Sequence, residues 1–348
     1  ALRDRMGIAK GNEWAPYAGV GGNIKPALRA LVESSPVSRQ KAQASPARFD
    51  VPAISVPEGE EQSTQTAFGK ILLDLAKGGS ELADRIITTS PDVTVSTNLG
   101  AWVNQRGLFR RQQMDDVFRK ARIPSAQKWE GDTAGQHLEL GIAENNLFLA
   151  LAAMGLSGDL FGERLLPIGT VYDPFIARGL DALNYACYQD ARFMVTATPS
   201  GITLSPEGGA HQSISTPLIG LGQPGLAYFE PAFADELAEI IRWGFKHMQA
   251  DGGGAVYLRL STRPADQPDR IMDEALVANV VAGGYWLERP TNLNTGAIVY
   301  AGALASETIL AGAEIEGAGI LAITSPDRLY KDWCNNISKI IKNIKKIK

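Results

Sequence analysis

The 348-residue chain has few cysteines, no long apolar run and no excess of basic charge. Its two cysteines, Cys187 and Cys334, are too few for a disulfide framework or a zinc module, and they predict reduced thiols. No stretch approaches the roughly 20 apolar residues that span a membrane. Lysine and arginine total 34 against 38 acidic residues, which argues against a basic nucleic-acid-binding surface. We therefore expect a cytoplasmic protein with no nucleic-acid or membrane partner.

The composition that remains is typical of a globular α/β protein. Apolar residues make up 45% of the chain, which is too much for a disordered one. Strand-like and helix-like segments alternate between about residues 60 and 265, and this predicts a parallel sheet with helices on both faces. The expected strands are 85–89, 164–169, 191–197, 225–229 and 255–260. The expected helices are one that Ser63 or Thr64 caps and that ends before Gly78, followed by 136–156, 174–188 and 232–248.

Composition also suggests how the chain divides into domains. Residues 1–58 are rich in proline, serine and charge and read as a connector, with a helix only at 24–33. The α/β domain is expected over 59–268, with a linker-like stretch at 264–274. A second α/β pattern follows over 269–333, with expected strands at 280–287, 297–301 and 320–324, a helix at 306–316 and another starting near Asp327. These elements are few for a domain, so we expect a truncated one.

The last residues, 334–348, differ in composition from everything before them. From Asn335 onward the chain contains only asparagine, isoleucine, serine and lysine, with five lysines. The isoleucines have helical spacing, so one interpretation is a basic amphipathic helix at a membrane surface. A solvated tail is a second interpretation. A non-native sequence that ends a truncated chain is the third, and the abrupt change in composition favours it.

Glu144 is an ionisable residue on the apolar stripe of the expected helix 136–156. Such a carboxylate is costly to bury without a partner. It is therefore either a structural glutamate paired with arginine or asparagine, or a functional carboxylate with a raised pKa.

A glycine-rich segment, Ser205–Ser213, follows the expected strand 191–197 and contains His211, one of three histidines. Loops at the carboxyl ends of parallel strands commonly bind ligands, so His211 is either a structural loop histidine or a proton carrier. Tyr172 and Phe175 precede a helix and are either core residues or a ligand platform. His247, beside Lys246, is expected to be solvated.

The segment GQHLELGIAENNLFLALAAMG, residues 135–155, resembles the pyrimidine-binding domain of thiamine-diphosphate enzymes of the transketolase superfamily. The segments LLPIGTVYDPFIARGLDALNYACYQDARF and TPSGITLSPEGGAHQS follow in the family's order and spacing. Within the superfamily the chain is most similar to the homodimeric pyruvate dehydrogenase E1 component, because PDVTVSTNLGAWVNQRGLFRR, residues 91–111, contains its Gly-Leu-Phe-Arg motif. The resemblance spans about residues 80–265.

This resemblance implies thiamine diphosphate and Mg²⁺ as cofactors and oxidative decarboxylation of a 2-oxo acid as the reaction. Glu144 matches the family glutamate that hydrogen-bonds N1′ of the aminopyrimidine. His211 and Glu207 match loop residues that face the substrate. Tyr172 and Phe175 fall near the aromatic wall of the pyrimidine pocket, and Ile142 is expected to line it.

The sequence departs from the family at the diphosphate half of the site. There the family uses a Gly-Asp-Gly motif and a later asparagine to hold Mg²⁺, whereas this chain has only Gly131-Asp132-Thr133. Residues 1–58 are then expected to be the linker from a missing diphosphate-binding domain. The chain alone is expected to be inactive, and the full-length protein is expected to be a homodimeric enzyme that can serve an acyltransferase (E2) subunit.

Two alternatives stay open. One is a transketolase that acts on sugar phosphates, for which a basic residue must recognise phosphate at the mouth of the pocket; Arg178, Arg259 and Arg263 are available. The other is a non-catalytic partner subunit that needs a chain with a diphosphate-binding domain.

Overall fold

The computed structural model describes residues 2–35, 46–291 and 296–335. The chain forms two compact units, one of residues 1–47 with 157–164, the other of residues 48–156 with 165–348. The described helices of the smaller unit are α1 (Leu2–Arg5), α2 (Lys25–Ser34) and α8 (Ser157–Phe161). Helix α2 agrees with the helix expected over 24–33, and none of its residues is buried. The domain boundaries at 58/59, 268/269 and 333/334 stay predictions.

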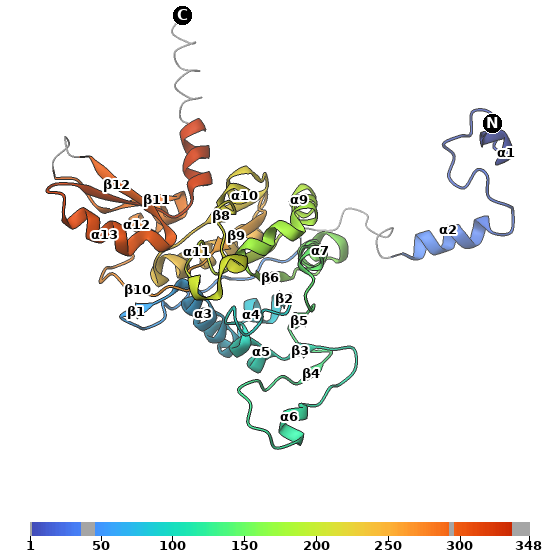
Figure 1. The fold of residues 1–348 in the computed structure, drawn as a ribbon. Helices are drawn as coiled ribbons and strands as arrows, with labels where there is room; N and C mark the ends of the chain where they lie inside the picture. The colour runs from blue at the N-terminus through green and yellow to red at the C-terminus, as the bar shows by residue number, and fades with distance from the viewer. Residues whose placement is uncertain (1, 36–45, 292–295, 336–348) are drawn as a thin grey trace, which may run out of the picture. The chain divides into compact units, whose positions relative to one another are not determined.

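The described part of the larger unit contains an eight-stranded sheet (Figure 1). Its strands are β2 (Ile86–Ser90), β3 (Leu108–Phe109), β4 (Gly131–Asp132), β5 (His137–Glu139), β6 (Leu166–Val171), β7 (Met194–Ala197), β8 (Leu226–Phe229) and β9 (Ala255–Arg259). They lie in the order β4-β3-β5-β2-β6-β7-β9-β8, and every adjacent pair is parallel. The predicted parallel sheet is confirmed.

Helices cover both faces of this sheet, as predicted. Along β9, Val256 and Leu258 pack in one apolar cluster, and the alternate residues Ala255 and Tyr257 pack in another. The first cluster includes residues of α3 (Thr64–Gly78), α4 (Glu81–Arg85), α5 (Gly100–Arg106) and α11 (Ala234–Gln249). The second includes residues of α7 (Glu144–Gly155) and α9 (Leu180–Tyr188), which lie side by side in Figure 1. This alternation explains why the strands read as continuous apolar runs.

The remaining elements of this region are short. They are α6 (Val117–Lys120), η1 (Asp173–Gly179), η2 (Ser205–Glu207), η3 (Gly209–His211) and α10 (Pro217–Gly222). The helix expected over 174–188 therefore begins as the 3₁₀ segment η1 and continues as α9. The helix expected after Ser63 is confirmed, since the Ser63 side chain accepts a hydrogen bond from the Thr66 amide and Gly79 ends α3 with φ +60°.

The single helix predicted over 136–156 is wrong. Residues His137–Glu139 form β5, which pairs with β2, and the buried His137 Nδ1 lies 2.8 Å from Thr88 Oγ1. Gly141 then turns the chain at φ +67°, and α7 begins at Glu144. Sheet pairing has overridden the helical spacing of the leucines. As a result Glu144 is the first residue of its helix and lies just beyond the carboxyl end of a strand.

The C-terminal region contains a second, mixed sheet. Strand β13 (Gly319–Ile323) lies between β11 (Gly284–Glu288), which is antiparallel to it, and β12 (Ala297–Ala301), which is parallel. The other elements are α12 (Glu274–Ala282), η4 (Gly302–Leu304), α13 (Ala305–Ala313) and a helix over 326–335. The expected strand 280–287 is wrong in its first part, because α12 continues to Ala282 after a cap in which Asp273 accepts a hydrogen bond from the Leu276 amide.

Residues 264–274 are also more than a linker. They include β10 (Ala265–Asp266), which pairs antiparallel with β1 (Glu61–Gln62). The two ends of the segment expected as the α/β domain are thus hydrogen-bonded to each other.

The interpretations of the tail concern residues 336–348, which lie outside the described residues. Within 2–35, 46–291 and 296–335, no helix combines the length and the apolar character needed to cross a bilayer.

The expectation that His247 is solvated is wrong. Its ring stacks on Trp243 with centroids 4.5 Å apart, and its Nε2 accepts a hydrogen bond of 3.1 Å from the Gly254 amide. Burial lowers the pKa of His247 to about 4, and the positive charges of Arg328 and Arg192 lower it further. The neutral ring is therefore part of the packing between α11 and its neighbours.

We predict that His247 titrates near pH 4 in the folded chain, well below the ordinary histidine pKa of about 6.5. Because the unfolded chain takes up this proton more readily, the stability that the neutral ring contributes is complete above about pH 6.5 and is lost as the pH falls toward 4. NMR titration of the three histidines measures this pKa directly. The control is His247→Gln, which should lack this part of the acid destabilisation, and a midpoint near 6.5 would contradict the prediction.

Gly179, at the end of η1, allows η1 to pack against α7. A Cβ atom there would lie 2.3 Å from Cδ2 of the fully buried Phe148 and 3.0 Å from the Glu144 carbonyl oxygen. We predict that Gly179→Ala lowers the free energy of unfolding by about 1–3 kcal/mol through overpacking. Urea denaturation measures the change. Gly78→Ala is the matched control, because no atom lies within 4 Å of its added methyl group, and equal stability of the two variants would refute the prediction.

Candidate functional site

The predicted site residues follow three strands of one parallel sheet, β5, β6 and β7, at their carboxyl ends. Glu144 begins α7 shortly after β5, Tyr172 directly follows β6, and His211 lies in the long loop after β7. Because β5, β2, β6 and β7 are parallel neighbours, these carboxyl ends lie along one edge of the sheet. The topology therefore brings residues far apart in the sequence to one place.

Three rings form the centre of this site. His211 lies edge-on to Tyr172 with ring centroids 5.1 Å apart, and 5.7 Å from the ring of Phe175. Glu207 Oε2 lies 3.7 Å from His211 Nδ1, which is too long for a hydrogen bond. The Nδ1 atom is buried and has no hydrogen-bond partner among the described residues. A buried nitrogen in that state is available to a bound group.

Glu144 joins this cluster through Arg178. Its side chain is 9% exposed, and its Oε1 accepts a hydrogen bond of 2.6 Å from Arg178 Nη1. The Arg178 guanidinium carbon in turn lies 3.9 Å from the centre of the Phe175 ring. The arginine-paired state considered for Glu144 from the sequence is thus the one in the structure, and its functional role stays a prediction.

Ile142 differs from the other five predicted residues. It lies between the Gly141 turn and α7, and it is 78% exposed. The structure therefore connects Glu144 through Arg178 to Phe175, which contacts Tyr172 and His211 with Glu207 close by, and it leaves Ile142 as an apolar side chain open to solvent.

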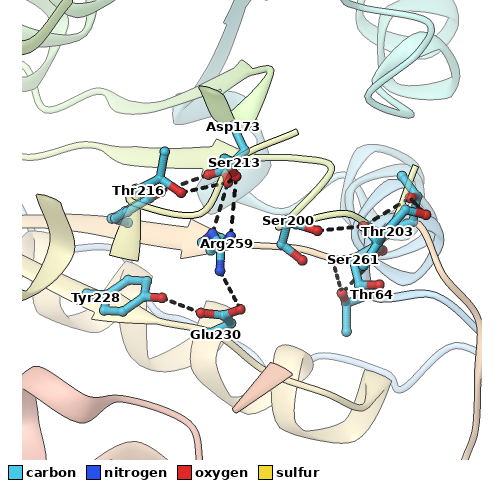
Figure 2. Close-up of polar contacts among 12 residues, drawn as sticks. Thr64, Asp173, Ser200, Thr203, Ser213, Thr216, Tyr228, Glu230, Arg259 and Ser261 are labelled. Atoms are coloured by element: carbon cyan, nitrogen blue, oxygen red, sulfur yellow. Dashed lines mark hydrogen bonds and ion pairs between the residues drawn. The ribbon is translucent and has the colours of Figure 1, made fainter. Parts of the chain in front are cut away.

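A buried ion cluster beside the site was missed from the sequence (Figure 2). Arg259, at the end of β9, donates from Nε to Asp173 Oδ2 at 2.9 Å and from Nη1 to Glu230 Oε1 at 2.7 Å. The three residues are 5%, 0% and 8% exposed, respectively. Burial alone would lower the pKa of Arg259, but the carboxylates of Glu230 and Asp173 outweigh it and hold the guanidinium charged. The signal that could have revealed the cluster is an arginine within the apolar strand 255–260, because a charge buried there needs partners.

Hydroxyl groups complete this cluster. Tyr228 donates to Glu230 Oε2, and burial together with the Glu230 charge raises the pKa of Tyr228, so the phenol stays protonated. Tyr257 donates to Asp173 Oδ1 at 3.0 Å, and Thr216 donates to Asp173 Oδ2 at 2.8 Å.

Metal ligands do not gather in the described part of the chain. Over 2–35, 46–291 and 296–335, no three histidine, cysteine, aspartate or glutamate side chains come together as a metal site. Asp132, in the Gly131-Asp132-Thr133 segment, accepts a hydrogen bond of 2.8 Å from the Ala134 amide.

The known proteins that this chain resembles in sequence include pyruvate dehydrogenase E1 components and a transketolase subunit. Residues 52–263 match the family model of the pyruvate dehydrogenase E1 component middle domain. The chain is 26% identical to the pyruvate dehydrogenase E1 component of Mycolicibacterium smegmatis over 78% of its length and 27% of that protein. It is also 26% identical to a 6-deoxy-6-sulfo-D-fructose transketolase subunit of a Clostridium species, over 56% of both chains.

Solved structures agree on the fold. A transketolase variant from Pichia stipitis superposes with a TM-score of 0.60 at 18% identity, covering 81% of this chain and 37% of that one. The chain spans about a third or less of the pyruvate dehydrogenase E1 components that it resembles, such as 27% of the Mycolicibacterium smegmatis protein and 30% of that from Pseudomonas aeruginosa. Because the middle-domain model matches residues 52–263, more than half of this chain, the chain belongs to the pyruvate dehydrogenase E1 middle-domain family of thiamine-diphosphate enzymes.

Proposed function

We propose that this chain supplies the pyrimidine-binding half of a thiamine-diphosphate site that cleaves the carbon–carbon bond of a 2-oxo acid, in an oxidative decarboxylation of the pyruvate type. The observation that carries the proposal is the buried Glu144 carboxylate, which Arg178 links to the ring of Phe175 and so to Tyr172 and His211. The family match and the E1 relatives support the same reaction class.

The residues present fit an aminopyrimidine. The Arg178 guanidinium, a planar N–C–N group, hydrogen-bonds Glu144 and lies over the Phe175 ring. An aminopyrimidine, also planar and with nitrogens at its edge, would make the same two kinds of contact. The unpartnered His211 Nδ1 is a further polar atom for a bound group. Binding would therefore exchange one planar nitrogen group for another.

Each side chain then has a separate role. Bound thiamine diphosphate supplies an electron sink for the pair released when the carbon–carbon bond breaks. Glu144 would hold a proton at N1′ of the pyrimidine, and its 9% exposure strengthens that hydrogen bond by excluding water. His211 and Glu207 would hold or move a proton on the substrate side. Tyr172 and Phe175 would form the apolar wall.

The diphosphate, its Mg²⁺ and the second half of the site belong, in this proposal, to a diphosphate-binding domain. We infer a homodimer in the full-length protein, built through pyrimidine and diphosphate domains, and an acyltransferase as acyl acceptor. The match to the middle-domain model supports the half-site.

The transketolase alternative is favoured by one relative, the sulfo-fructose transketolase subunit. Against it, each arginine considered for phosphate already has a carboxylate partner. Arg178 pairs with Glu144, Arg259 with Asp173 and Glu230, and Arg263 with Glu307. The buried Arg259 could not exchange its partners for phosphate, whereas Arg263, in a pair that is about half exposed, and Arg178, which is 53% exposed and which the cofactor would release from Glu144, could do so. Turnover of a ketose phosphate, but not of pyruvate, would establish this alternative.

We predict that the purified chain does not decarboxylate pyruvate with thiamine diphosphate and Mg²⁺, and that adding a separate diphosphate-binding chain of an E1 relative produces activity. Carbon dioxide release measures the reaction. Activity of the chain alone would overturn the half-site proposal. Inactivity of every mixture, with 2-oxo acids and ketose phosphates alike, would also contradict the half-site proposal.

In any active mixture, Glu144→Gln should lower kcat by at least about 100-fold, because the amide cannot hold the proton at N1′. Glu239→Gln is the matched control: Glu239 is also a partly buried glutamate paired with an arginine, Arg242, but it lies on α11. Full activity of the Glu144→Gln enzyme would remove the basis of the proposal.

A further inference from the structure

We propose that Asp173, held by Arg259, is a positioning residue that fixes the His211 loop against Tyr172 and Phe175. The role of His211 in chemistry rests on the function proposed above, whereas the positioning itself is a property of this chain. Asp173 is the residue after Tyr172, so whatever holds its carboxylate also holds the start of the aromatic wall.

The Asp173 carboxylate joins three segments. It accepts from Arg259 Nε and from the Tyr257 hydroxyl, both on β9, at 2.9 and 3.0 Å. It also accepts from Ser213 and Thr216, which end the loop after β7. With 0% exposure, Asp173 has no water to replace these donors. The carboxylate therefore ties the ends of β6 and β9 to the loop (Figure 2).

The loop contributes little burial of its own. Ile202 and Ile214 are 64% and 91% exposed, although apolar side chains anchor loops when they are buried. His211, by contrast, lies two residues before Ser213, and its ring contacts Tyr172 and Phe175. The polar bonds at Ser213 are therefore well placed to set the distance between His211 and the aromatic wall.

Arg259 fixes the carboxylate in turn. Its Nη2 donates to Ser213 Oγ at 3.3 Å, and its Nη1 is held by Glu230. The Ser213 backbone amide also donates to the Gly201 carbonyl oxygen at 3.0 Å, which closes the loop on itself. The Ser213 hydroxyl thus hydrogen-bonds both members of the Asp173–Arg259 pair.

Two hydroxyl deletions separate positioning from simple stabilisation. Ser213→Ala removes the loop's bond to Asp173 that lies nearest His211 in the sequence and leaves the bond from Thr216, whereas Tyr257→Phe removes a bond to the same carboxylate without touching the loop. Ser213→Thr keeps a hydroxyl and serves as the conservative rescue. The reporter is the His211 ring signal in NMR spectra of the chain without cofactor, with His137 and His247 as internal references.

We expect the His211 signal to lose its ring-current shift and broaden in Ser213→Ala, to stay in place in Tyr257→Phe and to return in Ser213→Thr. His137 and His247 should not move. An unchanged His211 signal in Ser213→Ala would overturn the proposal. So would equal changes in Ser213→Ala and Tyr257→Phe, or shifts of all three histidines, because each indicates general loosening.

This readout needs neither cofactor nor turnover. If Glu144→Gln left an active mixture unaffected while Ser213→Ala displaced His211, the proposed function would fall and the positioning role would stand. The reverse pair of results would overturn the positioning role alone. In an active mixture, Ser213→Ala should lower kcat about tenfold or more and change KM little, while Tyr257→Phe keeps kcat within about twofold of wild type.

Discussion

The buried charge of Arg259 is a constraint on which the carboxyl edge of the sheet depends. A charged arginine that is only 5% exposed requires carboxylates, and Asp173 and Glu230 supply them from the ends of β6 and β8. Those strands flank β7 and β9 in the sheet order, so the ion cluster ties the ends of β6, β8 and β9 together across β7. Tyr172, an aromatic residue of the candidate site, directly precedes Asp173, so the ion cluster also holds the start of the aromatic wall.

The same cluster connects the C-terminal sheet to the site. Glu230 donates its backbone N–H to the Thr324 carbonyl oxygen at 2.8 Å, and Ser325 donates to the Tyr228 carbonyl oxygen at 2.6 Å. Gly302, with φ +53°, lies so close that a Cβ atom there would be 2.5 Å from Glu230 Cγ. The second α/β region therefore packs directly against a residue that holds Arg259.

The parallel sheet could be predicted from the sequence. Strands such as 255–260 are buried on both faces and are therefore continuously apolar, and this local pattern can be recognised without knowing which strands pair. Sequence reasoning failed at 136–156, where leucines spaced for a helix belong partly to β5, because pairing with β2 is non-local. The same limit applied to His247, whose partner Gly254 lies beyond a turn, and to Ala265–Asp266, whose partner strand is some 200 residues earlier. Glu144 and His211 stood out through local context, whereas Asp173 and Glu230 gained meaning only from Arg259 across the sheet.

The contact of Arg178 with Glu144 and Phe175 has a thermodynamic consequence. A ligand that takes the place of the guanidinium must first break the contacts of Arg178 with Glu144 and Phe175. Its apparent binding free energy is therefore the difference between the ligand's own contacts and those of the arginine. The displaced arginine, already 53% exposed, moves into solvent at little cost. The buried Glu144 carboxylate therefore has a partner whether or not the ligand is present. Selectivity among ligands depends on the contacts that a ligand makes in addition to those that the guanidinium already makes.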